Sequence, residues 1–165
     1  MNITVEIAFE SDKWDRYSEI NEQLFSQLTQ MVLSRYPNLS AIKEIELSIL
    51  LTDNAHMKLL NSEFRDKDKP TNVLSFPDVE IDWRNIVEFV PDSSYMYLGD
   101  IAFAHEIIIE EAQDKSIDFY DHFKHLTLHA LLHLIGYDHI DDDDADAMES
   151  LEIEILESMG IKSPY

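Results

Sequence analysis

Three histidines arranged around one glycine, in the segment HALLHLIGYDH from His129 to His139, constrain this chain more than any other feature. An α-helix turns about 100° per residue, so His129 and His133 lie on one helix face and can bind the same ion. Gly136 is suited to end the helix in a left-handed conformation, which lets the chain fold back and bring His139 to the ion. The segment predicts a three-histidine metal site with one coordination position open for chemistry.

Two more histidines, His122 and His125, extend the stripe towards the start of the same predicted helix. His125 lies eight residues before His133, about 12 Å along the helix axis, so these rings converge poorly on one ion. We expect His122 and His125 to line the groove beside the metal. The pattern is four histidines on one stripe, followed by a glycine and a fifth histidine. Hydrogen-bonded polar residues of a core explain this pattern poorly.

The ligand set indicates which ion and which chemistry to expect. Three neutral imidazoles suit zinc, and copper, nickel or iron(II) less specifically. The pKa of a water on zinc falls towards about 7, so hydroxide is available at neutral pH and metal-assisted hydrolysis is expected. Metzincin proteases share the histidine spacing, but they carry a glutamate base directly after the first histidine, where this chain has Ala130. A peptidase is therefore disfavoured.

Other motifs extend the pattern beyond the histidines, and together they resemble the YbeY family of metal-dependent endoribonucleases, which act in ribosomal RNA maturation. The matching blocks are NSEFR at 61–65 with KPTNVLSFP at 69–77, LGDIA at 98–102, and the closing GYDH with the acidic helix after it. Their order and spacing agree from about Ile45 to the C-terminus. Ala130 stands where the family commonly has Gly, and Asn72 where it commonly has Asp; neither is a presumed ligand.

The resemblance implies an α+β, zincin-like fold and one zinc per chain, held by His129, His133 and His139. It implies that Arg65 belongs to the active cleft with these ligands. There, Arg65 would bind the scissile phosphate and stabilise its developing charge. The alternative is a surface arginine favoured by the C-terminal end of a helix dipole. The implied task is cleavage of single-stranded RNA in 16S ribosomal RNA 3′-end maturation and ribosome quality control.

A second group of residues consists of polar, basic or aromatic side chains near these motifs. The candidates for substrate binding are Lys67, Lys69, Ser75 and Phe76. Phe76 could stack on a base, although a core position is the more ordinary place for a phenylalanine. Asp138, directly before a ligand, could orient a histidine or cap a turn. Asp100 could orient a histidine or water, or lie solvated at a strand edge.

The acidic composition sets a condition on any RNA-binding hypothesis. Net charge is −22, from 34 acidic and 12 basic residues, which argues against general nucleic-acid binding. Arg65, Lys67 and Lys69 cluster within five residues and could make a local positive cleft beside the metal. We therefore expect weak affinity for free RNA, strong salt sensitivity, and a docking partner such as the small ribosomal subunit or its proteins.

Length and hydrophobicity predict one domain over residues 1–165, with 45% hydrophobic residues to form its core. The chain has no cysteine, which excludes disulfides and thiolate metal sites. The N-terminus has no signal-peptide pattern, and no run reaches the roughly 18 apolar residues that span a membrane. We expect a cytoplasmic protein.

Hydrophobic periodicity predicts a mixed four-stranded sheet packed against about five helices. The predicted strands are 3–9, 45–51, 73–76 and 97–103, and the predicted helices are 13–35, 54–64, 106–115, 119–135 and 143–159. Residues 78–96 lack a period and are predicted to be an excursion or lid. The short link across them permits antiparallel pairing of the third and fourth strands, but the pattern does not settle which strand is antiparallel. The Asp141–Asp146 run is interpreted as a helix start, not a calcium loop.

Three functions remain open at this point. The first is a zinc-dependent endoribonuclease whose general base is not identified. The second is a non-catalytic ribosome-assembly factor with structural zinc, which the open fourth position argues against because structural sites usually have four protein ligands. The third is a metallohydrolase acting on another substrate.

Overall fold

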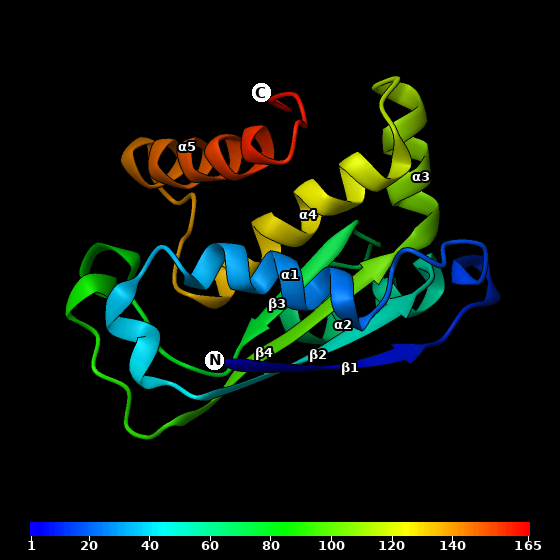
Figure 1. The fold of residues 1–165 in the computed structure, drawn as a ribbon. Helices are drawn as coiled ribbons and strands as arrows, with labels where there is room; N and C mark the ends of the chain where they lie inside the picture. The colour runs from blue at the N-terminus through cyan, green and yellow to red at the C-terminus, as the bar shows by residue number, and fades with distance from the viewer.

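Four strands form one mixed sheet, in the order β1-β2-β4-β3, in the computed structural model, which describes residues 1–165 (Figure 1). β1 (Asn2–Phe9), β2 (Glu44–Thr52) and β4 (Tyr95–Ala104) are parallel to one another. β3 (Val73–Pro77) is an edge strand and runs antiparallel to β4. The predicted α+β fold with a mixed four-stranded sheet is confirmed, and β3 is its antiparallel strand.

Five α-helices surround this sheet. α1 (Glu22–Leu33) and α4 (Phe119–Leu134) cover one face, and α5 (Asp142–Ser158) lies on the far side of α4 (Figure 1). α2 (Asn54–Arg65) lies on the opposite face, where Met57 packs against Leu74 and Ala102. α3 (His105–Asp114) follows β4 directly. None of these helices is both long enough and apolar enough to cross a membrane.

The main core lies between the sheet and helices α1 and α4. Alternate residues of β2, Ile45, Leu47, Ile49 and Leu51, are at most 2% exposed, as their period of two predicts. α4 faces this core with buried residues that include Phe123, Leu126, Thr127, Ala130, Leu131 and Leu134. Because these residues face the core, the histidines of α4 lie towards β3 and border the space between that strand and the helix.

The predicted helix over residues 13–35 is wrong in its first part. Residues Asp12–Trp14 form a short 3-10 turn, and α1 begins only at Glu22, after Asn21, whose side-chain oxygen accepts a hydrogen bond from the Leu24 N–H at 3.0 Å. Between them, consecutive i to i+3 turns space Trp14 and Tyr17 as a helix would. This spacing explains the error. The other helices and strands begin and end within two residues of their predicted limits.

Residues 78–96 are an excursion, but they do not form a lid over the histidines. A 3-10 helix, Trp83–Glu88, packs near the end of α4, and Trp83 stacks on Tyr137 with ring centroids 5.4 Å apart. Gly136 has φ +99°, and a Cβ there would lie 1.8 Å from the Ile81 carbonyl oxygen. The excursion therefore supports the glycine turn that follows α4, and only glycine fits at its closest approach.

Candidate metal centre

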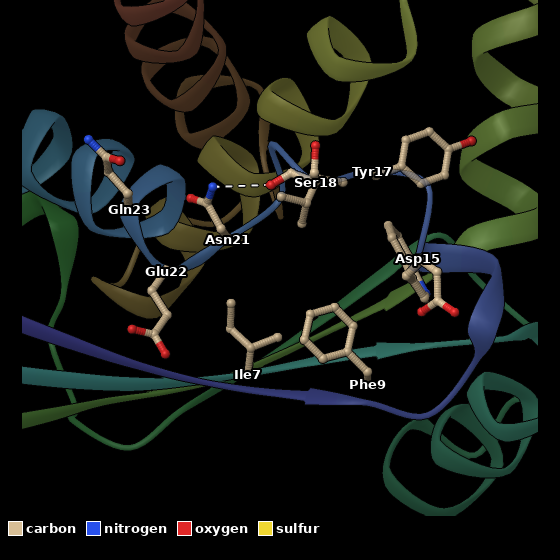
Figure 2. A pocket seen from close by; sticks show the side chains of 10 residues that line it. Ile7, Phe9, Asp15, Tyr17, Ser18, Asn21, Glu22 and Gln23 are labelled. Carbon is tan, nitrogen blue, oxygen red and sulfur yellow. Dashed lines mark hydrogen bonds between the residues drawn. The ribbon is translucent and has the colours of Figure 1, made fainter.

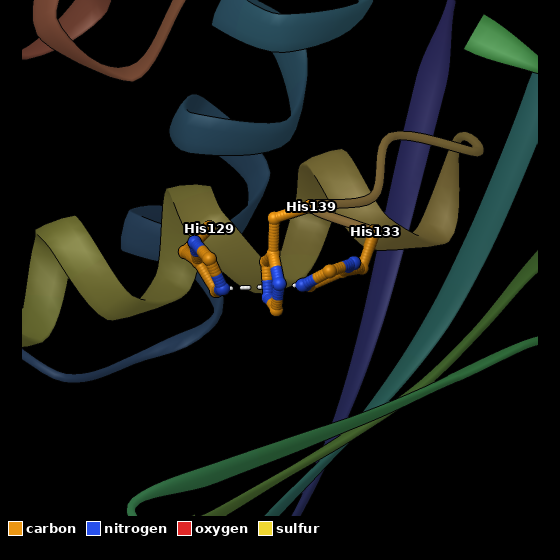
Figure 3. Close-up of side chains that lie close together, drawn as sticks. All are labelled: His129, His133 and His139. Atoms are coloured by element: carbon orange, nitrogen blue, oxygen red, sulfur yellow. Dashed lines mark hydrogen bonds between the residues drawn. The ribbon is translucent and has the colours of Figure 1, made fainter. Parts of the chain in front are cut away.

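The histidine cluster forms where α4 ends. His129 and His133 project from the last two turns of α4, and His139 returns from the loop after Gly136 (Figure 3). Each offers one ring nitrogen, and these three nitrogens lie within 4.8 Å of one another. The helical spacing and the glycine turn thus bring together the three predicted ligands.

Hydrogen bonds assign the ring nitrogens of the two helical ligands. The His129 Nδ1 lies 2.6 Å from the Glu152 Oε1, and the His133 Nδ1 lies 2.8 Å from the Tyr137 carbonyl oxygen. Both partners are acceptors, so in each neutral imidazole Nδ1 carries the hydrogen and Nε2 carries a lone pair. The two Nε2 atoms face each other at 3.1 Å. Two lone pairs this close repel unless a cation lies between them, so the residues fit a metal ion.

The electrostatics favour the metal-binding form of these side chains. Burial, together with the neighbouring His129 and His139, lowers the pKa of His133 to about 4, against the opposing effect of the hydrogen bond to the Tyr137 carbonyl. His133 is therefore neutral near pH 7, as a ligand must be. Burial alone would raise the pKa of Glu152, but hydrogen bonds from its partners, His125 and His129 first, lower it to about 2.

A cleft of about 330 Å³ runs from these ligands along α4, between that helix and β3. Arg65, at the end of α2, and Ser75, on β3, both line it. They also line a neighbouring opening beside His133 and His139. Lys67 and Lys69 are exposed and line neither space. Of the three clustered cations, only the arginine reaches the histidines.

Comparison with known proteins identifies the family of this chain. The family model described as Endoribonuclease YbeY matches residues 9–160. The chain belongs to the YbeY endoribonuclease family. An Endoribonuclease YbeY from Bartonella henselae (strain Houston 1) is 37% identical over 165 residues, covering 99% of this chain and 97% of that protein. The resemblance inferred from the sequence motifs is thereby confirmed.

A solved structure supports the same fold. The solution structure of TM1509 from Thermotoga maritima matches with a TM-score of 0.55 over 93% of this chain and 87% of that chain. The two sequences are 22% identical, so the match supports only the α+β architecture of this YbeY-family chain.

Two predicted site residues lie on the wrong face of the sheet. Successive strand residues point to opposite faces, so Ser75 points to the cleft and Phe76 points away from it. Phe76 contacts Phe64 at 5.2 Å between ring centroids, in a separate apolar cavity on the α2 face. Asp100 borders the same cavity and accepts a hydrogen bond from the Tyr97 hydroxyl at 2.8 Å. Neither Phe76 nor Asp100 reaches the histidines of this YbeY-family site.

Asp138 shapes the turn that carries the third ligand. Its Oδ1 accepts a hydrogen bond from the backbone N–H of His139 at 2.8 Å. Its contact is therefore with the backbone of the ligand, as in a capped turn. The ring of His133 is instead oriented by the Tyr137 carbonyl oxygen.

The sequence analysis missed Glu152, which orients His129 from α5. Glu152 is fully buried and accepts from His129, from His125 Nε2 at 3.0 Å, and from the Tyr165 hydroxyl at 2.5 Å. One signal was present: Glu152 lies four residues after Met148 and three before Ile155, within the apolar stripe of that helix. A carboxylate on a buried stripe needs partners, and here they are histidines.

His122 and His125 line the cleft as predicted, and each is tied to a carboxylate. The His122 Nε2 lies 3.2 Å from the Glu111 Oε1, and His125 bonds to Glu152. His56 and His105 lie elsewhere: His56 pairs with Glu10, and His105 packs edge-on against Trp14 at 5.3 Å between ring centroids.

A larger cavity, of about 680 Å³, lies away from this cleft, between β1 and the segment that precedes α1 (Figure 2). Its charged lining consists of the carboxylates of Asp15 and Glu22, beside apolar residues such as Ile7 and Phe9. No histidine or cation lines it, so the larger cavity is not the one that contains the candidate metal ligands. The smaller cleft holds the three candidate metal ligands and Arg65.

Proposed function

We propose that this chain is a zinc-dependent endoribonuclease that cuts single-stranded RNA at the cleft along α4. Membership of an endoribonuclease family supports an RNA-cleaving hydrolase. The observation that carries the metal dependence is the approach of the His129 and His133 Nε2 atoms to 3.1 Å, with both Nδ1 atoms bonded to acceptors.

The donor set favours zinc, one ion per chain. His129, His133 and His139 offer three neutral nitrogens and no thiolate or carboxylate, a set that suits zinc in a catalytic site. When bound, zinc supplies a Lewis acid and lowers the pKa of a coordinated water. Three protein ligands leave a coordination position free, which favours an enzyme over an assembly factor with structural zinc.

Arg65 is the residue suited to bind the scissile phosphate. Its guanidinium can make two parallel hydrogen bonds to phosphate oxygens and stabilise the charge that develops on them. The Ser75 hydroxyl lines the same cleft and can donate to the same phosphate group. Glu152 is an unsuitable general base because it is fully buried and its oxygens already accept from three donors. Proton removal must therefore use a group other than this carboxylate.

We further propose that the substrate is the 3′ end of 16S ribosomal RNA, and that the protein acts cytoplasmically in ribosome maturation and quality control. Family membership supports this choice. A net charge of −22 disfavours capture of free RNA through its phosphates, so the small ribosomal subunit or its proteins would present the strand. Lys67 and Lys69, outside the cleft, remain available to a strand that extends past Arg65.

The test is cleavage of a small-subunit rRNA 3′ fragment, free and within the small subunit, by zinc-loaded and chelator-treated protein. We expect cleavage to disappear on chelation and to return with zinc. Arg65→Ala should retain zinc and lower kcat roughly 10²- to 10³-fold. Lys58→Ala, which removes an exposed cation from the same helix outside the cleft, should stay near the parent rate. Full activity of Arg65→Ala, or no cleavage of either RNA by the parent, would contradict the proposal.

A further inference from the structure

The residues that follow α5 place an aromatic ring on the wall of the cleft. They turn back beyond the end of that helix (Figure 1). The Ser163 hydroxyl accepts from the Tyr165 N–H at 3.2 Å and lies 3.3 Å from the Tyr165 carbonyl oxygen, which closes a tight local turn. Tyr165 thereby lines the cleft together with Arg65 and the histidines of α4.

Tyr165 combines an anchored hydroxyl with an accessible ring. The hydroxyl donates to Glu152 at 2.5 Å and lies 3.3 Å from the His125 Nε2. The residue is nevertheless 57% exposed. Its ring meets His125 at 5.6 Å between centroids and at 88°, an edge-to-face contact. Because its hydroxyl is already anchored, such a ring loses little conformational freedom when it stacks on a flat ligand.

The position of the ring suits a nucleobase beside the metal. His125 separates Tyr165 from the ligand His129, and its ring centroid lies 5.6 Å from the first and 6.4 Å from the second. A strand that lies along this cleft with a phosphate at Arg65 would therefore pass the tyrosine, which lines the same cleft. Phe76, an aromatic that the sequence offered as a candidate to stack on a base, points away on the other face of the sheet.

Charge gives a reason for such a platform. On a chain of net charge −22, the general attraction to RNA phosphates is weakened, so uncharged contacts are a further source of affinity. Stacking on an aromatic ring is uncharged, tolerates any base, and requires a base that is already out of a duplex. This is the selectivity that a single-strand nuclease needs.

We propose that Tyr165 is a nucleobase-stacking platform that binds the base flanking the scissile phosphate. The inference rests on the proposed RNA cleavage and assigns part of its substrate binding to an uncharged ring. Tyr165 increases the affinity for RNA and the selectivity for single strands, while the metal site of the histidines and Arg65 bind the phosphate.

The first experiment separates the ring from its hydroxyl under saturating zinc, with single-stranded RNA cut by the parent. Tyr165→Ala should raise KM roughly 5- to 150-fold with kcat nearly unchanged, because a stacking contact is lost equally from bound substrate and transition state. Tyr165→Phe keeps the ring but loses the hydrogen bond to Glu152, so its KM should rise less than that of Tyr165→Ala. Tyr95→Ala removes a tyrosine of similar exposure on β4, outside the cleft, and is the matched control. Zinc content, measured on each protein, should be one per chain throughout.

The second experiment removes the base instead of the ring. A single abasic ribose is placed in turn at each position around the cleavage site. At one flanking position it should raise the parent KM and have no further effect on Tyr165→Ala, because both changes remove the same contact.

Additive effects of the two changes at every position, or an unchanged KM for Tyr165→Ala while the parent cleaves the RNA, would overturn the platform alone. A parent that cleaves no RNA would overturn the proposed function as well.

Discussion

The two halves of α4 carry the same residue type on the same stripe, yet the histidines use opposite ring nitrogens. In the first half, His122 and His125 present Nε2 to the carboxylates of Glu111 and Glu152, and their buried Nδ1 atoms have no partner. In the second half, the Nδ1 atoms of His129 and His133 donate hydrogen bonds to acceptors, and their Nε2 atoms face each other.

The difference shows that a ligand histidine is defined by the acceptor at its other nitrogen. Glu152 makes the point within one carboxylate, since its Oε2 meets the Nε2 of His125 and its Oε1 meets the Nδ1 of His129. The first contact holds the ring of His125 in a hydrogen bond within the protein. The second occupies the Nδ1 of His129 and leaves the lone pair of its Nε2 available to an ion. Helical spacing alone cannot separate these cases, because all four residues share one face.

The largest effect should come from removing a ligand from the second half. His133→Ala leaves two of three nitrogens, so zinc affinity should fall by well over the roughly 10- to 100-fold typical when only an outer hydrogen-bond partner is lost. RNA cleavage should disappear with it. Zinc content after gel filtration, and competition with a chromogenic chelator, measure the loss.

The matched control lies on the same helix. His122→Gln can still donate a hydrogen bond to Glu111 and should keep one zinc per chain, because the His122 Nε2 already faces a carboxylate. Equal loss of zinc from His133→Ala and His122→Gln would break the distinction between the two halves.

An intermediate effect is expected from the carboxylate that serves both halves. Glu152→Gln offers one accepting oxygen in place of two and turns an amide towards a donor, so His129 loses its orientation. Zinc affinity should fall roughly 10- to 100-fold. Glu154→Gln is the control, because Glu154 is exposed on the same helix and pairs only with Arg35, at 2.7 Å. Unchanged zinc affinity in Glu152→Gln, measured by chelator competition, would show that the carboxylate does not orient the ligand.

The smallest effect concerns protonation in the first half. Burial lowers the pKa of His122, against the opposing effect of the Glu111 carboxylate. Below about pH 6.5 the unfolded chain therefore binds a proton at this residue more readily than the folded chain does, and stability present above that pH is lost as pH falls.

His122→Gln removes this dependence. Between about pH 7 and pH 5, the free energy of unfolding of the metal-free parent should fall more than that of the variant. Urea denaturation at several pH values measures both proteins. A steeper fall in the variant would reverse the inferred sign.

Much of the fold was predictable because its elements are locally periodic. The alternation of Ile45, Leu47, Ile49 and Leu51 identified β2, and hydrophobic periodicity identified the helix α4. The prediction failed where successive turns at Trp14 and Tyr17 reproduced a helical spacing without a helix. Periodicity reports which residues are buried, and more than one backbone path can bury them.

The sequence by itself determined the three predicted ligands and the turn between them, because His129, His133, Gly136 and His139 belong to one helix and the loop after it. Only the tertiary structure decided which side chains surround them. Glu152 lies 23 residues from His129, and Tyr165 lies 40 residues from His125. Such neighbours depend on how α5 and the residues after it pack against α4. The spacing of residues along one segment carries no information about that packing.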